Sequence, residues 1–440
     1  MSAALDYHRA TNVGPNDENF GMDPAWSSQA PGRLEPFHDY GDAVRLPLEA
    51  SVAGPLLQAG AGIVRSQAAR DYGGGTIRWR AYSSAGGLFP VEAYLAAPDG
   101  LFSFDALTPA LVRIGGGDAR GRAAEAVGVG AGVEAFVVLT GIHARTGWKY
   151  GERGYRHVWW DAGTMLANLL ALAAADDLSP RLYTAFADRE LDDVVGLDGV
   201  YEFSLAALAL GNASAVSQRA PDTPAADLRR ASTAMRFPLT EAAHAAGALD
   251  RDAVGAWRAE PQGDEPRLDR DALARAIRRR SSVRTYAGTP LPRAELAGLL
   301  EWSEAPIPAD APRVVRQRVT AAAVEGLEPG IYDAQLNLIE RRDEQELRTR
   351  AGFVAMEQDH PKDAAVNVFQ LADLDQVVDQ LGDRGYRWAQ LEAGIRAGRV
   401  QIGAFMRGWG AAASTFYDDE VSRELGMSDS PMLMVAVGPR

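Results

Sequence analysis

The sequence has no cysteine, few histidines and no excess of basic residues. Without cysteine the chain forms no disulfide, no iron–sulfur cluster, no thiolate zinc site and no cysteine nucleophile. The six histidines are scattered, and no two of them have the four-residue spacing that places two metal ligands on one helix face. We therefore expect no metal centre.

The chain also lacks a long hydrophobic run. Its richest apolar stretch, residues 165–175, is too short to span a bilayer and is followed by two aspartates. The first residues lack the apolar segment of a signal peptide. A net charge of −14 argues against a nucleic-acid groove, although it leaves room for a local basic pocket that binds one phosphate. We expect a cytoplasmic protein without nucleic-acid or membrane partners.

An internal repeat organises the 440 residues. The segment GERGYR at 151–156 returns as GDRGYR at 382–387, and each copy enters a long helix that contains an Ala-Gly pair. A strand and a short helix follow, the latter ending at Gly196 or Gly426, and each half closes with an apolar strand. The offset is roughly 230 residues throughout, so a unit of about 200 residues occurs twice.

The repeat predicts four regions. Residues 1–45 read as an extended N-terminal arm, 46–212 as the first domain, 213–265 as a linker with one helical stretch, and 266–440 as a second, partly degenerate domain. GERGYR persists in both halves, so we interpret it as structural, with Arg153 in a buried ion pair or a helix-entry contact.

Three motifs occur in one half only. Arg280, Ser282 and Arg284 alternate, so an extended backbone places them on one side, where they suit a phosphate or form a solvated basic patch. The serine-glycine turn, residues 83–87, lets backbone N–H groups approach a flat or anionic ligand, unless it is an ordinary hairpin connection. The Lys-Tyr pair, Lys149 and Tyr150, is either functional or a surface lysine beside a core tyrosine.

Taken together, these motifs resemble the SagB-type (McbC-like, ThcOx-like) FMN-dependent dehydrogenases of the nitroreductase superfamily. The segments that carry the resemblance are YHRAT (7–11), Arg80 with SSAGGLFPVEAY (83–94), WKYGERGYR (148–156) with its helix, and RRRSSVRTY (278–286). Ser83 stands where the family usually has proline, and Thr164 where it usually has histidine. The resemblance implies an α+β fold, with a nitroreductase-like unit present twice in tandem as an intramolecular pseudo-dimer.

The resemblance also implies one FMN site built from both halves. The residues implied in cofactor binding are Arg280, Ser282, Arg284, Arg80, Ser83, Ser84, Ala85 and Gly86, with Ser414 and Thr415 from the AASTF turn. Lys149 and Tyr150 are implied in catalysis, as the groups that remove a proton while the flavin takes a hydride. Which of the two takes the proton stays open.

The function implied is oxidation of peptide thiazolines or oxazolines to thiazoles or oxazoles in ribosomal peptide natural-product biosynthesis. Its partners would be an azoline-containing peptide and a cyclodehydratase, and the chain would be a monomeric pseudo-dimer or part of a higher assembly. Two alternatives remain: another FMN oxidoreductase that acts on a small-molecule or carrier-bound substrate, and a flavin-free scaffold subunit of a modification complex.

Overall fold

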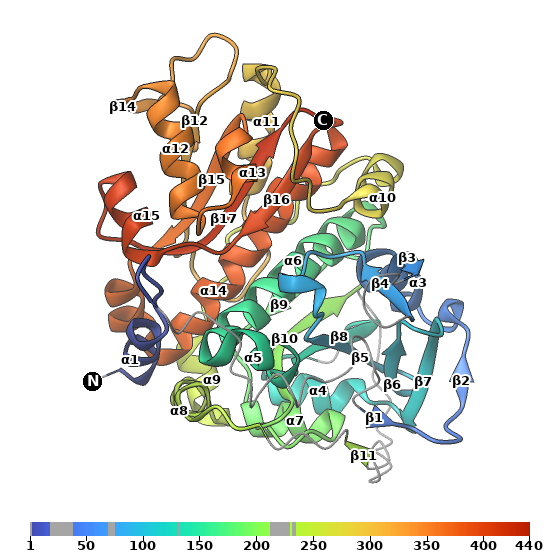
Figure 1. The fold of residues 1–440 in the computed structure, drawn as a ribbon. Helices are drawn as coiled ribbons and strands as arrows, with labels where there is room; N and C mark the ends of the chain where they lie inside the picture. The colour runs from blue at the N-terminus through green and yellow to red at the C-terminus, as the bar shows by residue number, and fades with distance from the viewer. Residues whose placement is uncertain (1, 18–37, 69–74, 131, 212–228, 231–234) are drawn as a thin grey trace.

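The computed structural model describes residues 2–17, 38–68, 75–130, 132–211, 229–230 and 235–440. The chain forms two α+β halves, with the blue-to-green half below and the orange-to-red half above in Figure 1. Residues 18–37 of the expected arm, and residues 212–228 and 231–234 at the expected linker, lie outside the described residues.

Each half is built on one antiparallel sheet, and the two sheets have the same strand order. The first runs β2 (Arg45–Leu46), β7 (Ala110–Gly115), β6 (Gly100–Asp105), β5 (Val91–Ala97), β8 (Ala135–Gly141), β10 (Phe203–Leu210) and β9 (Arg181–Tyr183). The second runs β14 (Leu338–Arg341), β13 (Gly330–Asp333), β12 (Arg316–Ala321), β15 (Val366–Ala372), β17 (Ser430–Gly438) and β16 (Gly410–Ser414). Apart from the edge strand β2, every strand of the first sheet has a counterpart in the second, which confirms the tandem α+β unit.

Two small pairings lie outside these sheets. β3 (Ile63–Ala68) pairs with β4 (Thr76–Arg80), and β1 (His38–Asp39) pairs with β11 (Arg229–Arg230). Because β4 pairs with β3 while β5 pairs with β6 and β8, the serine-glycine turn connects two different sheets. The alternative of an ordinary hairpin connection is therefore wrong.

Helices surround the sheets and separate them (Figure 1). The first half and the segment after it contain α1 (Ala3–Ala10), α3 (Ala53–Ala61), α4 (Arg120–Val127), α5 (Ala144–Tyr150), α6 (Gly154–Ala175), α7 (Asp188–Val195), α8 (Pro238–Ala246) and α9 (Arg251–Trp257). The second half contains α10 (Arg270–Arg279), α11 (Arg293–Glu304), α12 (Glu344–Val354), α13 (Asp359–Asp363), α14 (Leu374–Met406) and α15 (Asp418–Leu425). Helices α8 and α9 confirm the helical stretch expected in the linker.

The long helices α6 and α14 cross at the centre of the molecule (Figure 1). They meet at the repeated glycines, since a Cβ on Gly163 would lie 2.5 Å from Gly394 Cα and 2.5 Å from Leu391 O. Both helices are buried nearly all round, and one hydrophobic core runs through both halves. The window that makes Ala144–Ala175 long and apolar enough to cross a membrane is 94% buried here, as befits a core helix.

Replacing Gly163 by alanine is expected to destabilise the protein. Alanine is the better helix former by about 1 kcal/mol, but its methyl group would push apart two backbones in contact, and overpacking of this kind costs about 1–3 kcal/mol. Gly255→Ala in α9 is the matched control, because a Cβ there meets nothing within 4 Å. Urea unfolding measures both, and equal effects would show that the crossing tolerates the methyl group.

The repeated motif opens with glycine in both halves because the backbone there adopts a conformation that suits glycine. Gly151 has φ +56° and ψ −144°, and Gly382 has φ +65° and ψ −170°. Side-chain-bearing residues rarely adopt this conformation. In the first half this conformation ends α5 at the Lys-Tyr pair, just before the long helix α6. In the second half the same kink interrupts α14.

The arginines of the motif hold the two halves together. Arg153, directly before α6, and Arg156 of α6 donate to the buried Asp418 of α15, each at 2.8 Å, and this confirms the expected buried ion pair. Arg384 and Arg387 of α14 bind Asp188 of α7 in the same way, each at 2.6 Å. Each half thus supplies two guanidiniums to a carboxylate of the other half.

A third segment completes each of these ion-pair clusters. Val13 N–H, which follows α1, donates to Asp418 at 2.9 Å, and Leu249 N–H, which follows α8, donates to Asp188 at 2.9 Å. Residues 3–10 form helix α1 where we expected extended chain, because Ser2 caps them and Tyr7 packs into the core. The segment around α8, placed in the linker, is the second half's equivalent of this arm.

Candidate functional site

A cavity of about 220 Å³ lies between the two halves. Its lining residues are Ser83, Ser84, Ala85, Gly86, Tyr150, His157, Trp160, Asp161 and Thr164 from the first half, and Ser282, Arg284, Gln358, Ala413, Ser414, Thr415 and Leu433 from the second. Most residues expected to bind the cofactor are therefore brought together, although they are spread over more than 300 positions of the chain. The cavity requires both halves.

The serine-glycine turn enters the cavity as a short 3-10 helix, Ala85–Gly87. Gly86 and Gly87 have φ +61° and +64°, which glycine adopts without strain. Thr164 of α6 donates its hydroxyl hydrogen to Ser83 O at 2.7 Å. The two positions at which the chain departs from the family pattern are therefore in contact, and the threonine anchors the segment that proline would otherwise stiffen.

The Lys-Tyr pair meets this turn. A Cβ on Gly86 would lie 2.8 Å from Tyr150 Oη and 3.3 Å from Lys149 Nζ, so both polar ends reach the same glycine. Lys149 Nζ lies 5.2 Å from the centre of the Tyr150 ring. Tyr150 lines the cavity, whereas Lys149 is not among its lining residues. The kink at Gly151 positions the pair, because it ends α5 here.

The segment of residues 280–284 runs beside strand β16, and its side chains point to two different places. Val283 N–H donates to Ala411 O at 3.1 Å, and the flanking Ser282 and Arg284 both line the cavity. Arg280 instead donates to Ala81 O and Tyr82 O, at 3.2 and 2.8 Å, and so braces the chain that leads into the serine-glycine turn. Burial lowers the pKa of Arg280 to about 10.

Arg80 is not brought to the cavity. Its buried guanidinium donates to Ala61 O at 2.7 Å and to Val91 O at 2.9 Å, and it lies 3.5 Å from Glu92. These contacts join α3, β4 and β5, so they fit a structural role.

The second-half wall of the cavity is ordered by a histidine that sequence reasoning did not select. His360 Nε2 lies 2.7 Å from Ser414 Oγ, and its Nδ1 lies 3.4 Å from Arg284 Nη1. Burial lowers the pKa of His360 to about 4, so the ring is neutral at pH 7. Since Arg284 only donates, Nδ1 accepts and Nε2–H donates to Ser414.

Helix α6 contributes three further residues that the sequence did not single out. The His157 ring packs edge-on against Tyr150 at 4.3 Å and lies 4.9 Å from Trp160. Asp161 accepts hydrogen bonds from Ser84 Oγ at 2.5 Å and Ala85 N at 3.1 Å. The repeat held a signal for His157, which has tryptophan, Trp388, at the corresponding place in the other half.

The corresponding region of the second half is closed. The cavity beside Trp388 and Glu392 has only about 80 Å³. Glu392 stands at the place of Asp161 and accepts from Val314 N and Val315 N, at 2.8 and 3.0 Å. Asp310 accepts from the N–H groups of Thr184 and Ala185, the counterparts of Ser414 and Thr415. Protein side chains thus fill the space that stays open on the other side.

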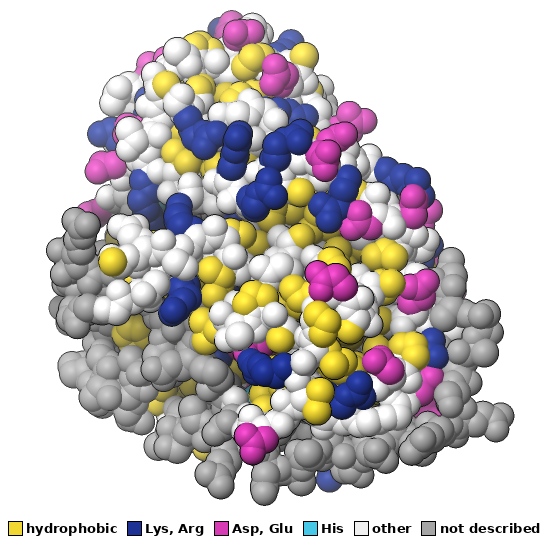
Figure 2. Space-filling view, turned by 90° about the vertical axis from the view of Figure 1, so that its right-hand side faces the viewer, with side chains coloured by type: hydrophobic (Ala, Val, Ile, Leu, Met, Phe, Trp, Pro, Cys, Tyr) yellow, Lys and Arg dark blue, Asp and Glu magenta, His cyan; other side chains and the backbone are white. Residues whose placement is uncertain are grey.

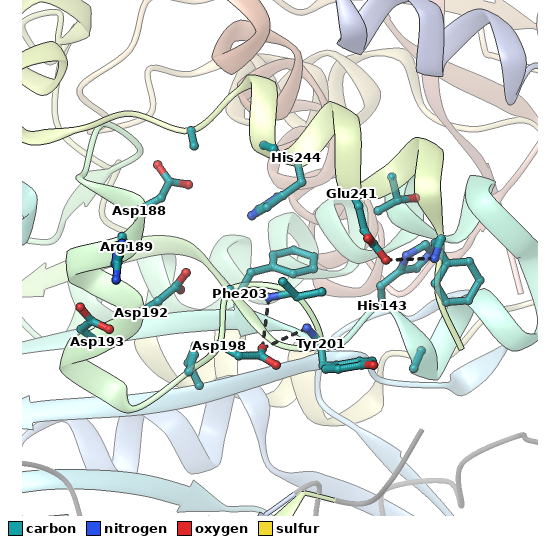
Figure 3. A pocket seen from close by; sticks show the side chains of 18 of the residues that line it. His143, Asp188, Arg189, Asp192, Asp193, Asp198, Tyr201, Phe203, Glu241 and His244 are labelled. Atoms are coloured by element: carbon teal, nitrogen blue, oxygen red, sulfur yellow. Dashed lines mark hydrogen bonds between the residues drawn. The ribbon is translucent and has the colours of Figure 1, made fainter. Parts of the chain in front are cut away.

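A larger cavity, of about 650 Å³, lies elsewhere in the first half and contains none of the predicted site residues (Figure 3). Asp188, Arg189, Asp192 and Asp193 project into it from α7, opposite Glu241 and His244 of α8. Asp188 belongs to an ion-pair cluster that joins the halves. Burial raises the pKa of Asp192 to about 7.

The surface charge is unevenly spread. Lysine and arginine side chains gather on one face of the second half, although the chain as a whole is acidic (Figure 2). The negative net charge therefore coexists with a local basic surface.

Comparison with known proteins supports the tandem α+β fold and identifies the protein family. The model of the nitroreductase family matches residues 55–212 and 277–439, once in each half. A nitroreductase-like protein of Methanocaldococcus jannaschii is 27% identical over 185 residues, which is 39% of this chain and 93% of that protein.

One solved structure matches the architecture over the whole chain. A nitroreductase-like protein from Anabaena variabilis has a TM-score of 0.83 at 22% identity, with 100% of both chains covered. A chain of an E. coli microcin synthetase complex has a TM-score of 0.32 at 19% identity, covering 48% of this chain and 81% of its own. Members of the matched family are flavin-dependent oxidoreductases, and with both halves matched, this chain belongs to the nitroreductase family.

Proposed function

We propose that the chain is an FMN-dependent azoline dehydrogenase, which oxidises thiazoline or oxazoline rings of a peptide to thiazoles or oxazoles. One observation carries the proposal: the Lys-Tyr pair of the first half converges on Gly86, in a cavity that also holds Ser282 and Arg284 of the second half. An oxidoreductase that aromatises a ring needs a base beside its redox cofactor, and this arrangement supplies a candidate base.

The residues present fit a flavin. The serine-glycine turn lines the cavity with small residues, which suits close approach of a flat ring. Ser282 and Arg284 are exposed and offer a hydroxyl and a guanidinium to a phosphate. The aromatic rings of His157 and Trp160 also line the cavity and offer apolar contact to a flat ring.

In this proposal the cofactor and the Lys-Tyr pair have separate chemical roles. When bound, FMN supplies the acceptor for the hydride that leaves the azoline ring. Tyr150 Oη, from a residue that lines the cavity, and Lys149 Nζ approach the same glycine, and one of the two takes the proton that leaves the neighbouring ring carbon. The lysine's positive charge beside the phenol favours the phenolate, and the phenolate favours the charged lysine, so the pair acts as a unit.

One FMN per chain is expected, with Arg280→Ala raising the dissociation constant of FMN at least about tenfold, since a partly buried guanidinium that braces residues 81 and 82 is lost. Absorbance and phosphate analysis of the purified protein give the stoichiometry, and fluorescence titration gives the affinity. Arg279→Ala is the matched control, because Arg279 is exposed at the end of α10. Two FMN per chain would contradict a single composite site.

The substrate and partner rest on the resemblance to azoline dehydrogenases. The substrate class is an azoline-containing peptide, and the partner is the cyclodehydratase that forms the ring. The decisive assay offers the FMN-loaded protein a peptide thiazoline or oxazoline in air, without NAD(P)H. Oxidation to the azole supports the proposal, whereas flavin reduction by NAD(P)H alone would favour an oxidoreductase of small molecules. Protein that cannot be loaded with FMN would favour a scaffold subunit.

A further inference from the structure

Asp161 occupies an unusual place for a carboxyl group. It is 4% exposed, lines the cavity from α6, and is hydrogen-bonded through both oxygens to the serine-glycine turn. Ser84 Oγ lies 2.5 Å from Oδ2, and Ala85 N–H donates to Oδ1 at 3.1 Å. Its two hydrogen-bond donors are thus a hydroxyl and a backbone N–H, and the positive charge of Arg280 acts on it as well. The mechanism proposed above gives this group no role.

The protonation state of Asp161 decides where the hydroxyl hydrogen of Ser84 points. Phe89 N–H donates to Ser84 Oγ at 2.8 Å, so the hydroxyl is already an acceptor on that side. A serine hydroxyl has a single hydrogen to donate. When Asp161 is ionised, that hydrogen points to Oδ2 and is unavailable to a ligand. When Asp161 is neutral, its own O–H donates to Ser84 Oγ, and the serine hydrogen turns toward the cavity.

The surroundings hold this carboxyl near the balance between the two states. Burial raises the pKa of Asp161 to about 8, outweighing the hydrogen bonds from Ser84 and Ala85 and the positive charge of Arg280. The other titratable groups close by are Tyr82, which precedes the turn, and His157, one helical turn along α6, with Tyr150, Lys149 and Arg284 at the same turn or cavity. Tyr82 stays neutral because burial raises its pKa, and His157 stays neutral because burial lowers its pKa.

We propose that Asp161 and Ser84 form a proton-linked hydrogen-bond switch: neutral Asp161 makes Ser84 a donor to an acceptor atom of the flavin ring, and ionised Asp161 withdraws that donor. Asp161 is thus a positioning residue that acts through Ser84. The inference rests on the proposed FMN site, and it deepens that proposal by assigning the site a dependence on pH. The acceptor is a ring carbonyl oxygen or ring nitrogen.

The consequence is a dependence of FMN affinity on pH. If the neutral form binds, the apparent dissociation constant scales with 1 + 10^(pH − pKa), so it rises about tenfold between pH 7 and pH 9 for a pKa near 8. The flavin phosphate has its second pKa near 6 and contributes little to this change.

Asp161→Asn tests the switch, because asparagine imitates the neutral acid. Its amide N–H donates to Ser84 Oγ while its oxygen accepts from Ala85 N–H, so the donor stays aimed at the cavity. We expect Asp161→Asn to bind FMN as tightly at pH 9 as wild type does at pH 7, with no dependence on pH. Ser84→Ala is expected to bind weakly at both values. A merely structural carboxylate predicts the reverse, with asparagine weakening binding at every pH.

Glu392→Gln provides the matched control, since Glu392 holds the corresponding backbone in the closed half and should leave the pH dependence unchanged. FMN fluorescence titration of the full chain at pH 7, 8 and 9 measures all four proteins. FMN binding that is flat with pH in wild type, or equally pH-dependent in Asp161→Asn, overturns the switch alone. If wild type binds FMN at none of the three pH values, the proposed cofactor site and the switch are overturned together.

Discussion

Replacing Asp418 by asparagine is expected to lower the free energy of unfolding by about 3–5 kcal/mol. The carboxylate is 1% exposed and is paired with Arg153 and Arg156. Asparagine keeps the shape but removes the charge, and its amide group would present hydrogens to two buried guanidiniums. Because the arginines belong to the first half and the carboxylate to the second, the loss falls on the contact between the halves.

Asp188, the counterpart of Asp418 in the first half, provides a second test of the same idea. Asp188→Asn should cost a similar amount, since Asp188 is paired with Arg384 and Arg387 in the same way. Glu190→Gln, in the exposed pair with Arg251, is the control and should cost no more than about 1 kcal/mol. Urea unfolding followed by fluorescence measures all three. A loss below 1 kcal/mol for Asp418→Asn would mean that the pairs do not join the halves.

The Asp188 cluster also predicts how stability depends on acid. Burial alone would raise its pKa, but Arg384 and Arg387 bring the pKa of Asp188 down to about 2. The folded pKa is thus below the unfolded value, so this group's contribution is complete above about pH 4 and is lost as the pH falls through 2.

The repeat explains how much of the fold the sequence could predict. A motif kept in both halves must serve both, and GERGYR does so through a kink at Gly151 and Gly382 and through arginines that cross the interface. The Ala-Gly pair marked the crossing of α6 and α14. The arm was harder to predict, because α1 depends on burial of Tyr7 against distant segments, which eight residues of sequence do not reveal.

The sequence could predict those site residues that belong to a family motif and occur in only one of the two halves. The serine-glycine turn, Ser282, Arg284 and Tyr150 line one cavity, as expected of residues that survive in one half only. Arg80 was expected there from the family resemblance, but its guanidinium donates to Ala61 O and Val91 O instead. Asp161 and His360 were missed because their importance lies in contacts with Ser84, Ser414 and Arg284 that no local pattern encodes.

The largest catalytic effect is expected from the Lys-Tyr pair. Lys149→Ala should reduce the rate of azoline oxidation by about 10²–10⁴, the range for loss of a positioned proton-transfer group, while FMN content stays unchanged. Tyr150→Phe separates the two roles, because the ring that packs on His157 remains and only the hydroxyl is lost. Gln380→Ala is the matched control, since Gln380 is exposed at the corresponding place in the other half.

The outcome identifies the base. If Tyr150 takes the proton with Lys149 stabilising its phenolate, Tyr150→Phe is inactive at every pH, and Lys149→Ala regains activity at high pH, where the phenol ionises unaided. If Lys149 takes the proton, Lys149→Ala stays inactive throughout, and Tyr150→Phe keeps a measurable rate. Single-turnover flavin reduction by the azoline peptide, followed by absorbance from pH 6 to pH 10, distinguishes the two. Wild-type rates in both variants would contradict a catalytic role for the pair.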